Sequence, residues 1–421
     1  MKRLILFLFV FFCITNVYAQ NVFGRLSTSA YFYETHPDVS ISSVNVRSFN
    51  ILSLTATKDK LSLKTRMNFE ADFSENYKDH PRLRFYNFYL EGKNLFNLVT
   101  VRLGRQTLIN SLGASFDGVS LKFKKKKYTL TTYYGGNVPA YQKFELTDDL
   151  ADNYVLGAKF NTEIYKNLNL GLDYINKHFK PDEYYAERLD ENYNPVNTLI
   201  KKNSLQYHYL SLNARYLKKD NFRLSSKFVY DLNFKQASRF NFSGRIQATK
   251  KLGINLYYNY REARIAYNSI FSVFNFGNSQ EIETGLDYKF GKQLSITGKY
   301  GYVKYKDENS SRLSLNLHTI YGTLNYRKTF GFAGELDAVS IYTAKTLFNG
   351  KLTPSIGISY TDYKISEDDE TDNLISLTGG INYRPAKKLS FDFQTQYYNN
   401  KYYKNDLRFL LRANYYFRIN R

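Results

Sequence analysis

Apolar and polar residues alternate with a period of two along most of this 421-residue chain. In residues 61–73, Leu, Met, Phe and Ala at odd positions oppose Ser, Lys, Arg, Asn, Glu and Asp at even positions. The same pattern recurs in residues 222–234, 239–249 and 407–419. Successive side chains of a β-strand point to opposite faces, so the alternation predicts strands with one apolar and one charged face.

The connections between these segments are of two kinds. Short polar turns are expected at residues 58–60, 124–127, 218–220, 250–251, 291–292 and 385–388. Longer connections are expected at residues 34–43, 74–81, 107–115, 137–152, 180–203, 263–277 and 365–373. Short turns at one rim and long loops at the other are typical of an outer-membrane barrel with both termini on the periplasmic side.

We therefore predict an all-β fold, a transmembrane antiparallel up-and-down β-barrel of about 18 strands, within a range of 16 to 20. About twenty segments qualify as strands, and residues 312–364 leave the parity open because 329–333 and 346–351 fit turns at either rim. A soluble β-sandwich or propeller is the rival fold. Such folds do not oppose so many Arg and Lys residues to an apolar row, and no blade-length repeat is present.

The composition agrees with a barrel wall. Mean hydropathy is −0.48, which excludes bilayer-crossing helices, yet 17% of residues are aromatic, with 40 Tyr, 33 Phe and no Trp. A barrel places such rings at the membrane interfaces, with lipid outside and water inside. Strand edges must also be paired in lipid, which closure of the sheet achieves.

The first residues have the layout of a signal peptide. Lys2 and Arg3 precede the apolar run 4–12, and residues 17–19 form a small-x-small cleavage pattern. We expect a signal peptide over residues 1–19 and one barrel domain over residues 20–421. The sole cysteine, Cys13, lies in the apolar run, so no disulfide and no cysteine metal site are expected in the mature chain. No other metal and no cofactor are expected.

The chain is strongly basic, with a formal charge of +21. Without Lys2 and Arg3 the 59 basic residues become 57, and 57 against 38 acidic residues leaves +19. Export argues against a nucleic-acid partner, which leaves anionic lipid, including lipopolysaccharide, or anionic small solutes.

Basic residues predominate on the predicted inward rows. They are Lys64, Arg66, Arg102, Lys122, Arg223, Lys227, Arg239, Arg245, Arg261, Lys289, Lys299, Arg408 and Arg412, set against Glu70, Asp72, Asp231, Glu281, Glu283, Asp287 and Asp392. A positive lumen would attract anions. The alternative is that these charges pair across strands and hydrate the wall.

One pair of segments carries a resemblance. Residues 101–106 read Val-Arg-Leu-Gly-Arg-Gln, and residues 116–121 read Phe-Asp-Gly-Val-Ser-Leu. Here the chain resembles porins of the alginate-export and related substrate-specific families, in a Tyr/Phe-rich style that looks like Bacteroidota-type envelopes. The resemblance implies that Arg102, Arg105, Gln106 and Asp117 lie at or near a constriction that passes an anionic sugar or small anion. The alternative is a hairpin whose Arg–Asp pair fixes the register.

Other features suggest weaker sites. The apolar loop segment 265–276 fits either an inward constriction or a cover at the rim, and 180–203 is a candidate receptor surface. The acidic run 367–372 matches no calcium loop. His318 shares a strand phase with Ser314 and Asn316, but this spacing is too loose for a catalytic triad, and we expect no enzyme.

Three functions follow from these patterns. We expect a porin-like channel of the cell outer membrane for small, anionic solutes, inserted by the barrel assembly machinery and, by analogy with wide porins, trimeric. The alternatives are a non-conducting barrel whose loops bind a surface partner and, third, a barrel hydrolase.

Overall fold

The computed structural model of the chain describes residues 21–420 with short gaps. The gaps are residues 39–40, 75–80, 108–111, 114, 146, 148, 182, 190, 192, 202–204, 219–220, 268, 275, 307, 332–333, 365–368 and 402–404. The predicted signal peptide, with Cys13, lies outside the described residues, as do Glu367 and Asp368 of the acidic run.

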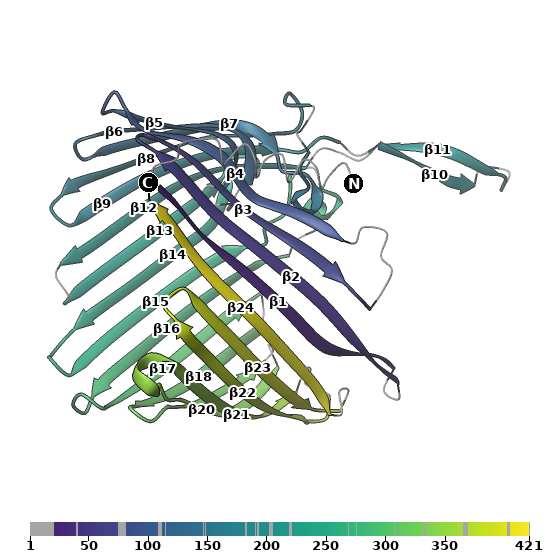
Figure 1. Cartoon of the computed structure of the whole chain (residues 1–421). Coiled ribbons are helices and arrows are strands. Elements are labelled where there is room, and N and C mark those ends of the chain that lie inside the picture. The colour runs from purple at the N-terminus through teal and green to yellow at the C-terminus, as the bar shows by residue number, and fades with distance from the viewer. Residues whose placement is uncertain are drawn as a thin grey trace.

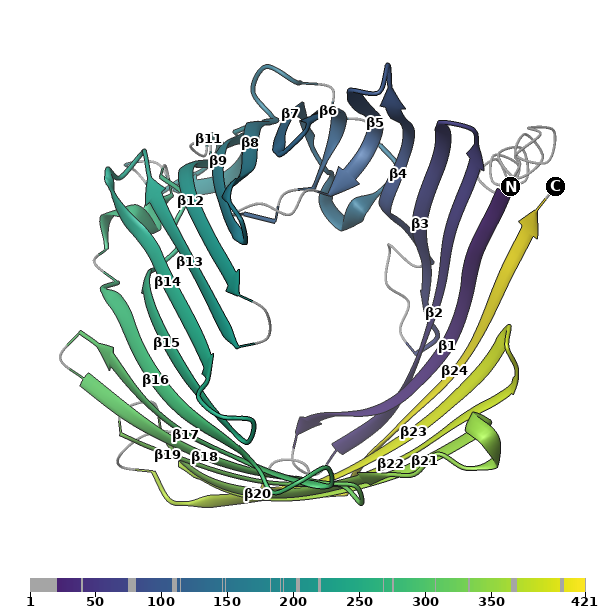
Figure 2. The same cartoon turned by 90° about the vertical axis from the view of Figure 1, so that its left-hand side faces the viewer.

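The described residues form one closed antiparallel sheet of 22 strands and a separate two-stranded hairpin. Figure 1 shows the tilted strands from the side, and Figure 2 shows them as a ring. The hairpin, β10 (Glu183–Leu189) and β11 (Pro195–Lys201), projects away from the ring (Figure 1). Among the described residues, no helix has the length and apolar character needed to cross a membrane.

The ring contains the remaining strands in chain order. The first half is β1 (Asn21–Asp38), β2 (Ile41–Lys58), β3 (Leu61–Asp72), β4 (Arg82–Leu95), β5 (Val99–Thr107), β6 (Ser115–Lys125), β7 (Tyr128–Asn137), β8 (Tyr154–Tyr165), β9 (Leu168–His178), β12 (Gln206–Lys218) and β13 (Phe222–Asp231). The second half is β14 (Gln236–Gln247), β15 (Leu252–Glu262), β16 (Asn278–Lys289), β17 (Leu294–Tyr305), β18 (Glu308–Thr319), β19 (Thr323–Gly331), β20 (Glu335–Ala344), β21 (Leu352–Lys364), β22 (Asp372–Ala386), β23 (Leu389–Asn399) and β24 (Asp406–Asn420). Three short 3₁₀ turns, η1 (Ala140–Gln142), η2 (Ile270–Val273) and η3 (Phe348–Gly350), lie in connections.

The first and last strands close the ring. Asn21 pairs with Asn420, and the ladder between β1 and β24 continues to Phe32 and Phe409. Ser27 Oγ donates a hydrogen bond of 2.8 Å to Asn414 Oδ1 across this seam, between residues 387 positions apart in sequence. The ring therefore has no free edge at its seam, as a barrel in lipid requires.

The prediction of an all-β, antiparallel closed barrel is confirmed, but the predicted strand number of about 18 is wrong: the ring has 22 strands. The unsettled residues 312–364 contain most of β18 and all of β19, β20 and β21. Two of these strands are only 9 and 10 residues long, and three residues separate them. Alternation that resumes after so short a turn resembles one longer strand, so the count was too low.

The two rims differ as expected. One rim contains the start of β1 and the end of β24, and its connections are short, such as 59–60 and 126–127. The other rim has longer connections, such as 138–153 and 263–277. We call them the turn rim and the loop rim. The predicted long connection at 34–43 is wrong, because β1 extends to Asp38 and β2 begins at Ile41. The predicted loop 180–203 contains the β10–β11 hairpin.

The strand pairings divide the residues into two faces. Residues directly opposite each other on neighbouring antiparallel strands share a face. When these pairings are followed around the ring, Lys64, Arg245 and Arg412 fall on the same face, and this face is continuous around the whole barrel. On this face Arg245 reaches Asp287, two strands away, at 2.6 Å. Side chains converge in this way on the concave side, so we call it the inner face.

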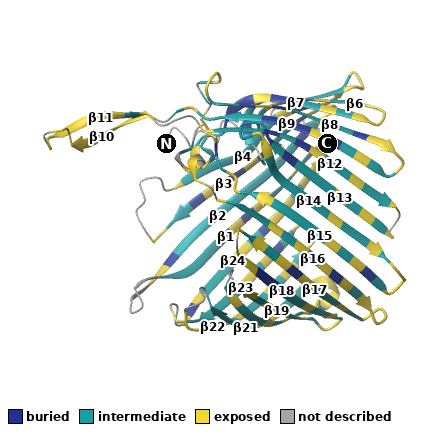
Figure 3. Cartoon of the chain, turned by 180° about the vertical axis from the view of Figure 1, so that it is seen from behind, coloured by how far each residue is buried: buried dark blue, intermediate teal, exposed yellow. Residues whose placement is uncertain are grey.

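The outer face exposes large apolar side chains. Leu286 is 54% exposed and Ile282 is 49% exposed, and both lie on the outer row of β16. The accessible surface of the chain is 28018 Å², whereas a compact soluble protein of this length would expose roughly 17,000 Å². Exposed and less exposed residues alternate along the strands (Figure 3).

Aromatic residues gather at the two ends of the outer face. Exposed rings at or near the turn rim are Phe96, Tyr165, Phe290, Tyr321 and Phe348, and those toward the loop rim are Phe73, Tyr134, Tyr302, Phe330 and Tyr360. Exposed aliphatic residues lie between them, among them Leu172, Leu212, Ile246, Leu315 and Ile358. Two aromatic belts around an aliphatic band are the pattern of a barrel surface in a bilayer.

A small apolar cluster lies on the inner face near the loop rim. Its buried members are Phe116, Tyr133, Val155, Ile175, Tyr209 and Val229, one from each of six neighbouring strands. Leu112 and Tyr207 pack against it. This stripe is the one clustered core among the described residues, so the barrel is held together mainly by its backbone ladders.

Candidate functional site: the charged inner wall

Most of the predicted pore-lining residues share the inner face. The pairings place twelve of them there, on eight strands: Lys64, Arg66, Arg102, Lys122, Arg223, Lys227, Arg239, Arg245, Arg261, Lys299, Arg408 and Arg412. Lys289 lies on the same face at the turn rim.

Two pairs of arginines face each other on neighbouring strands. Arg223 on β13 is directly opposite Arg245 on β14, and Arg239 on β14 is directly opposite Arg261 on β15. Like charges in directly opposite positions destabilise a sheet unless other groups compensate. In the described part of the chain, no carboxylate lies within ion-pair distance of Arg223, Arg239 or Arg261.

Arg239 is the least satisfied of these arginines. Its Nε atom is buried and lacks a hydrogen-bond partner among the residues described. A buried donor without a partner costs free energy, which an anion placed between the facing arginines would recover. This wall therefore has the chemistry to attract anions.

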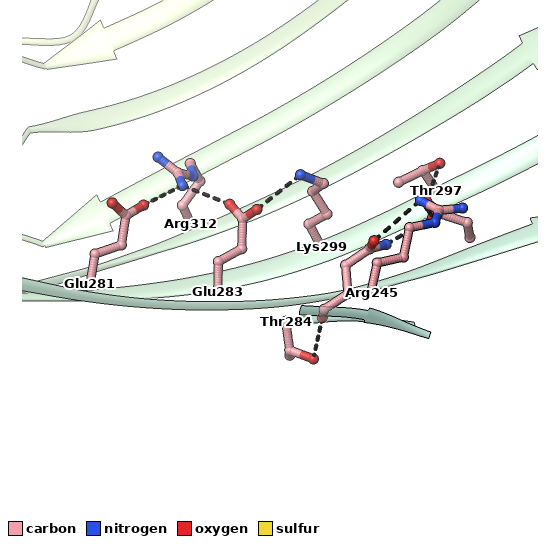
Figure 4. A network of polar contacts seen from close by, with 9 residues as sticks. Arg245, Glu281, Glu283, Thr284, Thr297, Lys299 and Arg312 are labelled. Atoms are coloured by element: carbon pink, nitrogen blue, oxygen red, sulfur yellow. Dashed lines mark hydrogen bonds and ion pairs between the residues drawn. The ribbon is translucent and has the colours of Figure 1, made fainter. Parts of the chain in front are cut away.

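The neighbouring strands carry an acidic network that satisfies other cations. Arg312 Nη2 donates to Glu281 Oε1 and to Glu283 Oε2, both at 2.7 Å, and Lys299 Nζ donates to Glu283 Oε1 at 2.9 Å. Figure 4 shows these side chains on one side of the sheet, together with Arg245. Here the charges pair across strands, so this part of the wall is close to neutral.

Asp287 compensates one of the facing arginines. Its Oδ2 accepts from Arg245 Nη1 at 2.6 Å and from Asn255 Nδ2 at 2.8 Å, and its Oδ1 accepts from Thr297 at 2.9 Å. Arg245 is thus held by a carboxylate while Arg223 opposite it is not.

A hollow of about 740 Å³ lies where these groups meet. Arg215, Arg223, Arg245, Lys299 and Arg312 contribute to its lining, along with Glu281 and Glu283. A second hollow of about 360 Å³ adjoins it and shares Arg215, Ser225, Ser243 and Tyr257. The arginine-rich wall of β12 to β15 therefore borders two adjoining hollows.

Elsewhere on the inner face, some cations have partners and some do not. Glu91 accepts from Lys64 Nζ at 2.8 Å and from Arg102 Nε at 2.7 Å, and Asp406 pairs with Arg408 at 2.5 Å. No acidic partner is found for Arg66, Lys122 or Arg412 within the described ranges. The two predictions for the inward rows, a positive lumen or charges that pair across strands, thus apply to different parts of one wall.

The motif residues Arg105 and Asp117 lie elsewhere than expected. They are directly opposite each other on β5 and β6, but on the outer row rather than the row of Arg102. Their side chains are 5% and 7% exposed, and they form a bidentate pair at 2.7 Å. This arrangement matches the alternative prediction, in which the Arg–Asp pair fixes the register of the hairpin. A period of two already puts positions 102 and 105 on opposite faces of the strand.

Gln106 is on the inner face but is fully buried. Its Oε1 accepts from Ser120 at 2.6 Å and its Nε2 donates to Gly118 O at 3.1 Å. A side chain so enclosed contacts no solute, which differs from the expected place at a constriction.

The sequence-based candidates missed several inner-face cations, among them Arg215 and Arg312. Arg215 continues the alternation Ser211, Asn213, Arg215 on β12, and Arg312 lies in the segment whose strands could not be assigned. The alternation along β12 would have found Arg215, whereas Arg312 needed the correct strand order.

The loops hold the other candidate sites. Tyr267 donates its N–H to Gln206 O at 3.1 Å, and its ring contacts Phe234 at 5.4 Å, so the apolar segment 265–276 is anchored at the rim over β12 to β14. In the loop before β8, the backbone N–H of Asp152 and the ammonium of Lys180 hold the pKa of Asp149 below its usual value. Asp372 of the acidic run is 3.6 Å from Lys401.

His318, Ser314 and Asn316 follow one another along the inner row of β18. Among the described residues, no group of three His, Cys, Asp or Glu side chains is arranged to hold a metal ion.

Comparisons with known proteins give a likeness of fold. No protein-family model and no curated protein matches the chain. The translocation pore of the P pilus usher PapC is 9% identical, with 94% of this chain and 99% of that chain covered, at a TM-score of 0.50. OpdQ of Pseudomonas aeruginosa is 9% identical (94% and 98% covered, TM-score 0.42), and OccAB1 of Acinetobacter baumannii is 12% identical (95% and 97%, TM-score 0.40). At such identities the likeness concerns the barrel architecture alone.

Proposed function

We propose that this protein is a porin-like channel of the cell outer membrane, which passes small anionic solutes through a basic lumen. The observation that carries the proposal is the pair of facing arginines, Arg223 with Arg245 and Arg239 with Arg261, beside a polar hollow on the inner wall. No residue needs to do covalent chemistry, because selectivity in such a channel comes from pore width and lining charge.

The outer face supports a place in a membrane. Its exposed aliphatic band between two aromatic belts would be a liability in water but matches the hydrocarbon core and interfaces of a bilayer. The barrel of the PapC translocation pore, which this ring resembles, is described as a pore. On this proposal the partners are membrane lipid and lipopolysaccharide, the barrel assembly machinery that inserts the chain, and two further copies in a trimer.

The strand number bears on the lumen. A barrel of 22 strands encloses a wide interior, which in transporters of that size is filled by a plug. Within the described residues, the longest connection between ring strands is 179–205, and its hairpin projects away from the ring (Figure 1). This arrangement supports an aqueous passage bordered by the inner face.

The charge pattern supports a preference for anions. Acidic partners neutralise Lys299, Arg312, Arg102 and Arg408, so the uncompensated field comes mainly from β12 to β15. Guanidinium groups with free donors bind carboxylates and phosphates bidentately and raise the local concentration of anions.

Reversal potentials in planar bilayers test the proposal. The double variant Arg223→Glu/Arg261→Glu should shift the reversal potential in a salt gradient from anion toward cation preference. Lys292→Glu, in the turn after β16, changes the charge outside the wall and serves as the matched control. Equal selectivity in the parent and the double variant, or the absence of conductance steps from folded protein, would refute the channel.

One observation favours a second function. The β10–β11 hairpin forms its own sheet and exposes Tyr185, Leu189 and Tyr193. Two strands alone are marginally stable in water, so this arm fits a surface that binds a partner. Replacing residues 183–201 by a short Gly-Ser linker should leave conductance intact if the channel is the function. Loss of a bound surface partner with unchanged conductance would identify the second role.

A further inference from the structure

The wall of the barrel splits between β4 and β5. The ladder between them ends at the pair Phe88 and Arg105, although β4 extends back to Arg82 and β5 extends on to Thr107. Beyond this point, within the described residues, β4 pairs only with β3, down to Arg82 opposite Glu70, and β5 pairs only with β6, up to Thr107 opposite Ser115. The split therefore opens toward the loop rim.

Glycines allow neighbouring strands to approach closely where the β4–β5 ladder ends. Gly104 has a φ of 119°, and a Cβ there would lie 2.4 Å from Phe88 O, so no other residue fits without a shift. Gly118 and Gly135 are level with it on β6 and β7, and a Cβ on either would lie within 2.4 Å of a backbone oxygen on the next strand. A β-bulge between Arg66 and Met67 bends the β3–β4 ladder at the same height.

A piece of the β7–β8 connection fills the split. We call residues 140–145 the wedge segment. The Phe144 ring lies 4.7 Å from Phe85 and 5.6 Å from Phe88 on β4, and the Tyr141 ring lies 4.2 Å from the guanidinium of Arg82. The wedge segment thus contacts the part of β4 that lies beyond the described β4–β5 ladder.

Arg105 fastens the wedge segment to both sides. Its Nη1 donates to Gln142 O at 2.9 Å, to Lys143 O at 2.7 Å and to Phe85 O at 3.3 Å, and its Nη2 donates to Glu145 O at 3.2 Å. Asp117 holds the same guanidinium from β6. One side chain therefore links β4, β5, β6 and the wedge segment, and it supplies a partner to a β4 carbonyl that the ladder leaves free.

The outer side of the split is lined for an apolar chain. Phe85, Phe88 and Phe144 form the outer side. On the inner face, the apolar cluster begins at Phe116, directly opposite Gln106 on β5. Phe116 thus lies one strand away from the split, with Gln106 of β5 between.

A cation without a full set of partners lies beside the same gap. Arg82, at the start of β4, has a buried Nε with no hydrogen-bond partner in the described structure. Its guanidinium stacks on Tyr141 of the wedge segment. A carboxylate would supply the missing partner to Arg82.

We propose that this split is a lateral portal between the barrel interior and the membrane, closed by the wedge segment, for an amphiphile with one apolar chain and a carboxylate head. The apolar chain passes along Phe85 and Phe88 of β4, at the place that Phe144 occupies in the closed state. The head remains near Arg82 until the chain has entered the bilayer. This route is independent of the axial passage of small anions.

A reversible lock tests the portal. In a Cys13→Ser background, Phe85→Cys with Phe144→Cys ties the wedge segment to β4 when oxidised. Leu90→Cys with Leu103→Cys joins the same two strands at an intact pair below the split and is the matched control. The readout is transfer of an anthroyloxy-labelled stearate from the aqueous phase to the bilayer of proteoliposomes, with chloride conductance measured alongside.

The portal predicts that oxidation of the Phe85/Phe144 pair lowers transfer to the rate of protein-free liposomes, that reduction restores it, and that the control lock changes neither rate. Conductance should remain constant throughout. Transfer that is equal in the locked and reduced forms would overturn the proposal, as would a lock that also abolishes conductance. As a second test, Arg105→Gln releases the wedge segment and should raise transfer in protein shown to be folded. An unchanged rate would overturn the portal.

Discussion

Arg223 and Arg245 face each other across β13 and β14, yet only Arg245 has a carboxylate partner, Asp287, at 2.6 Å. One acidic side chain therefore sets how much positive charge this level of the wall presents. Since Asp287 comes from β16, two strands away, the balance depends on the barrel curvature that brings them together.

Removing that carboxylate should strengthen anion preference. In Asp287→Asn, Arg245 loses its counter-charge while Arg223 remains opposite, so the reversal potential should move further toward that of anions. We expect a loss of about 1 kcal/mol in unfolding free energy, because the pair is partly exposed to water. Asp287→Asn/Arg223→Gln should return both quantities toward the parent values, and a shift toward cations in the single variant would contradict the assignment.

Breaking the buried Arg105–Asp117 pair should be far more costly. Arg105→Gln leaves Asp117 buried and uncompensated, which predicts a loss of about 3–5 kcal/mol in urea unfolding from liposomes. Arg102→Gln is the matched control, because Arg102 is 32% exposed and its partner Glu91 keeps Lys64. Similar losses in the two variants would show that burial of the pair does not set its contribution.

Alanine substitutions at Gly104 and Gly291 distinguish the cost of a strained backbone conformation from the cost of a close contact with the neighbouring strand. Their φ values are 119° and 118°, but a Cβ on Gly104 would lie 2.4 Å from Phe88 O while a Cβ on Gly291 meets nothing within 4 Å. Gly291→Ala should cost about 1 kcal/mol for the conformation alone. Gly104→Ala should cost clearly more and increase proteolysis within the wedge segment. Equal unfolding free energies would mean that β5 does not approach β4 as closely as described.

Depth-dependent substitutions test whether the outer face contacts lipid. Leu286→Arg, within the aliphatic band, should lower the free energy of unfolding from a bilayer by about 2–4 kcal/mol, whereas Tyr321→Arg at the turn rim should cost about 0–1 kcal/mol. Urea titrations in liposomes give both values. If the two costs are equal, the band between the aromatic belts is not the hydrocarbon-facing surface.

Much of the fold was readable from alternation. The phases read from residues 61–73, 239–249 and 407–419 match β3, β14 and β24, and the thirteen cations assigned inward lie on one face. In 222–234, the strand ends at Asp231, because Asp231 accepts from the N–H groups of Asn233 and Phe234 and forms a turn. Periodicity detects the face of a strand better than its end.

The charge pairing could not be read in the same way. Arg312 meets Glu281 and Glu283 only because β16, β17 and β18 are neighbours in the ring, and their order depends on a correct strand count. The position of Arg105 was within reach, since its phase differs from that of Arg102. The wedge segment was not, because its contacts join parts of the chain that no local pattern relates.

The seam between β1 and β24 has a consequence for how the molecule forms. The Ser27–Asn414 bond joins groups 387 positions apart, so it arises only when nearly the whole polypeptide is present. Until then, the incomplete sheet has two edge strands, whose backbone N–H and C=O groups find no hydrogen-bond partner in lipid. Pairing these edges brings together the most distant parts of the sequence, so we expect closure of the barrel to be the slow step of folding. Incomplete chains then depend on a factor that covers the two edge strands.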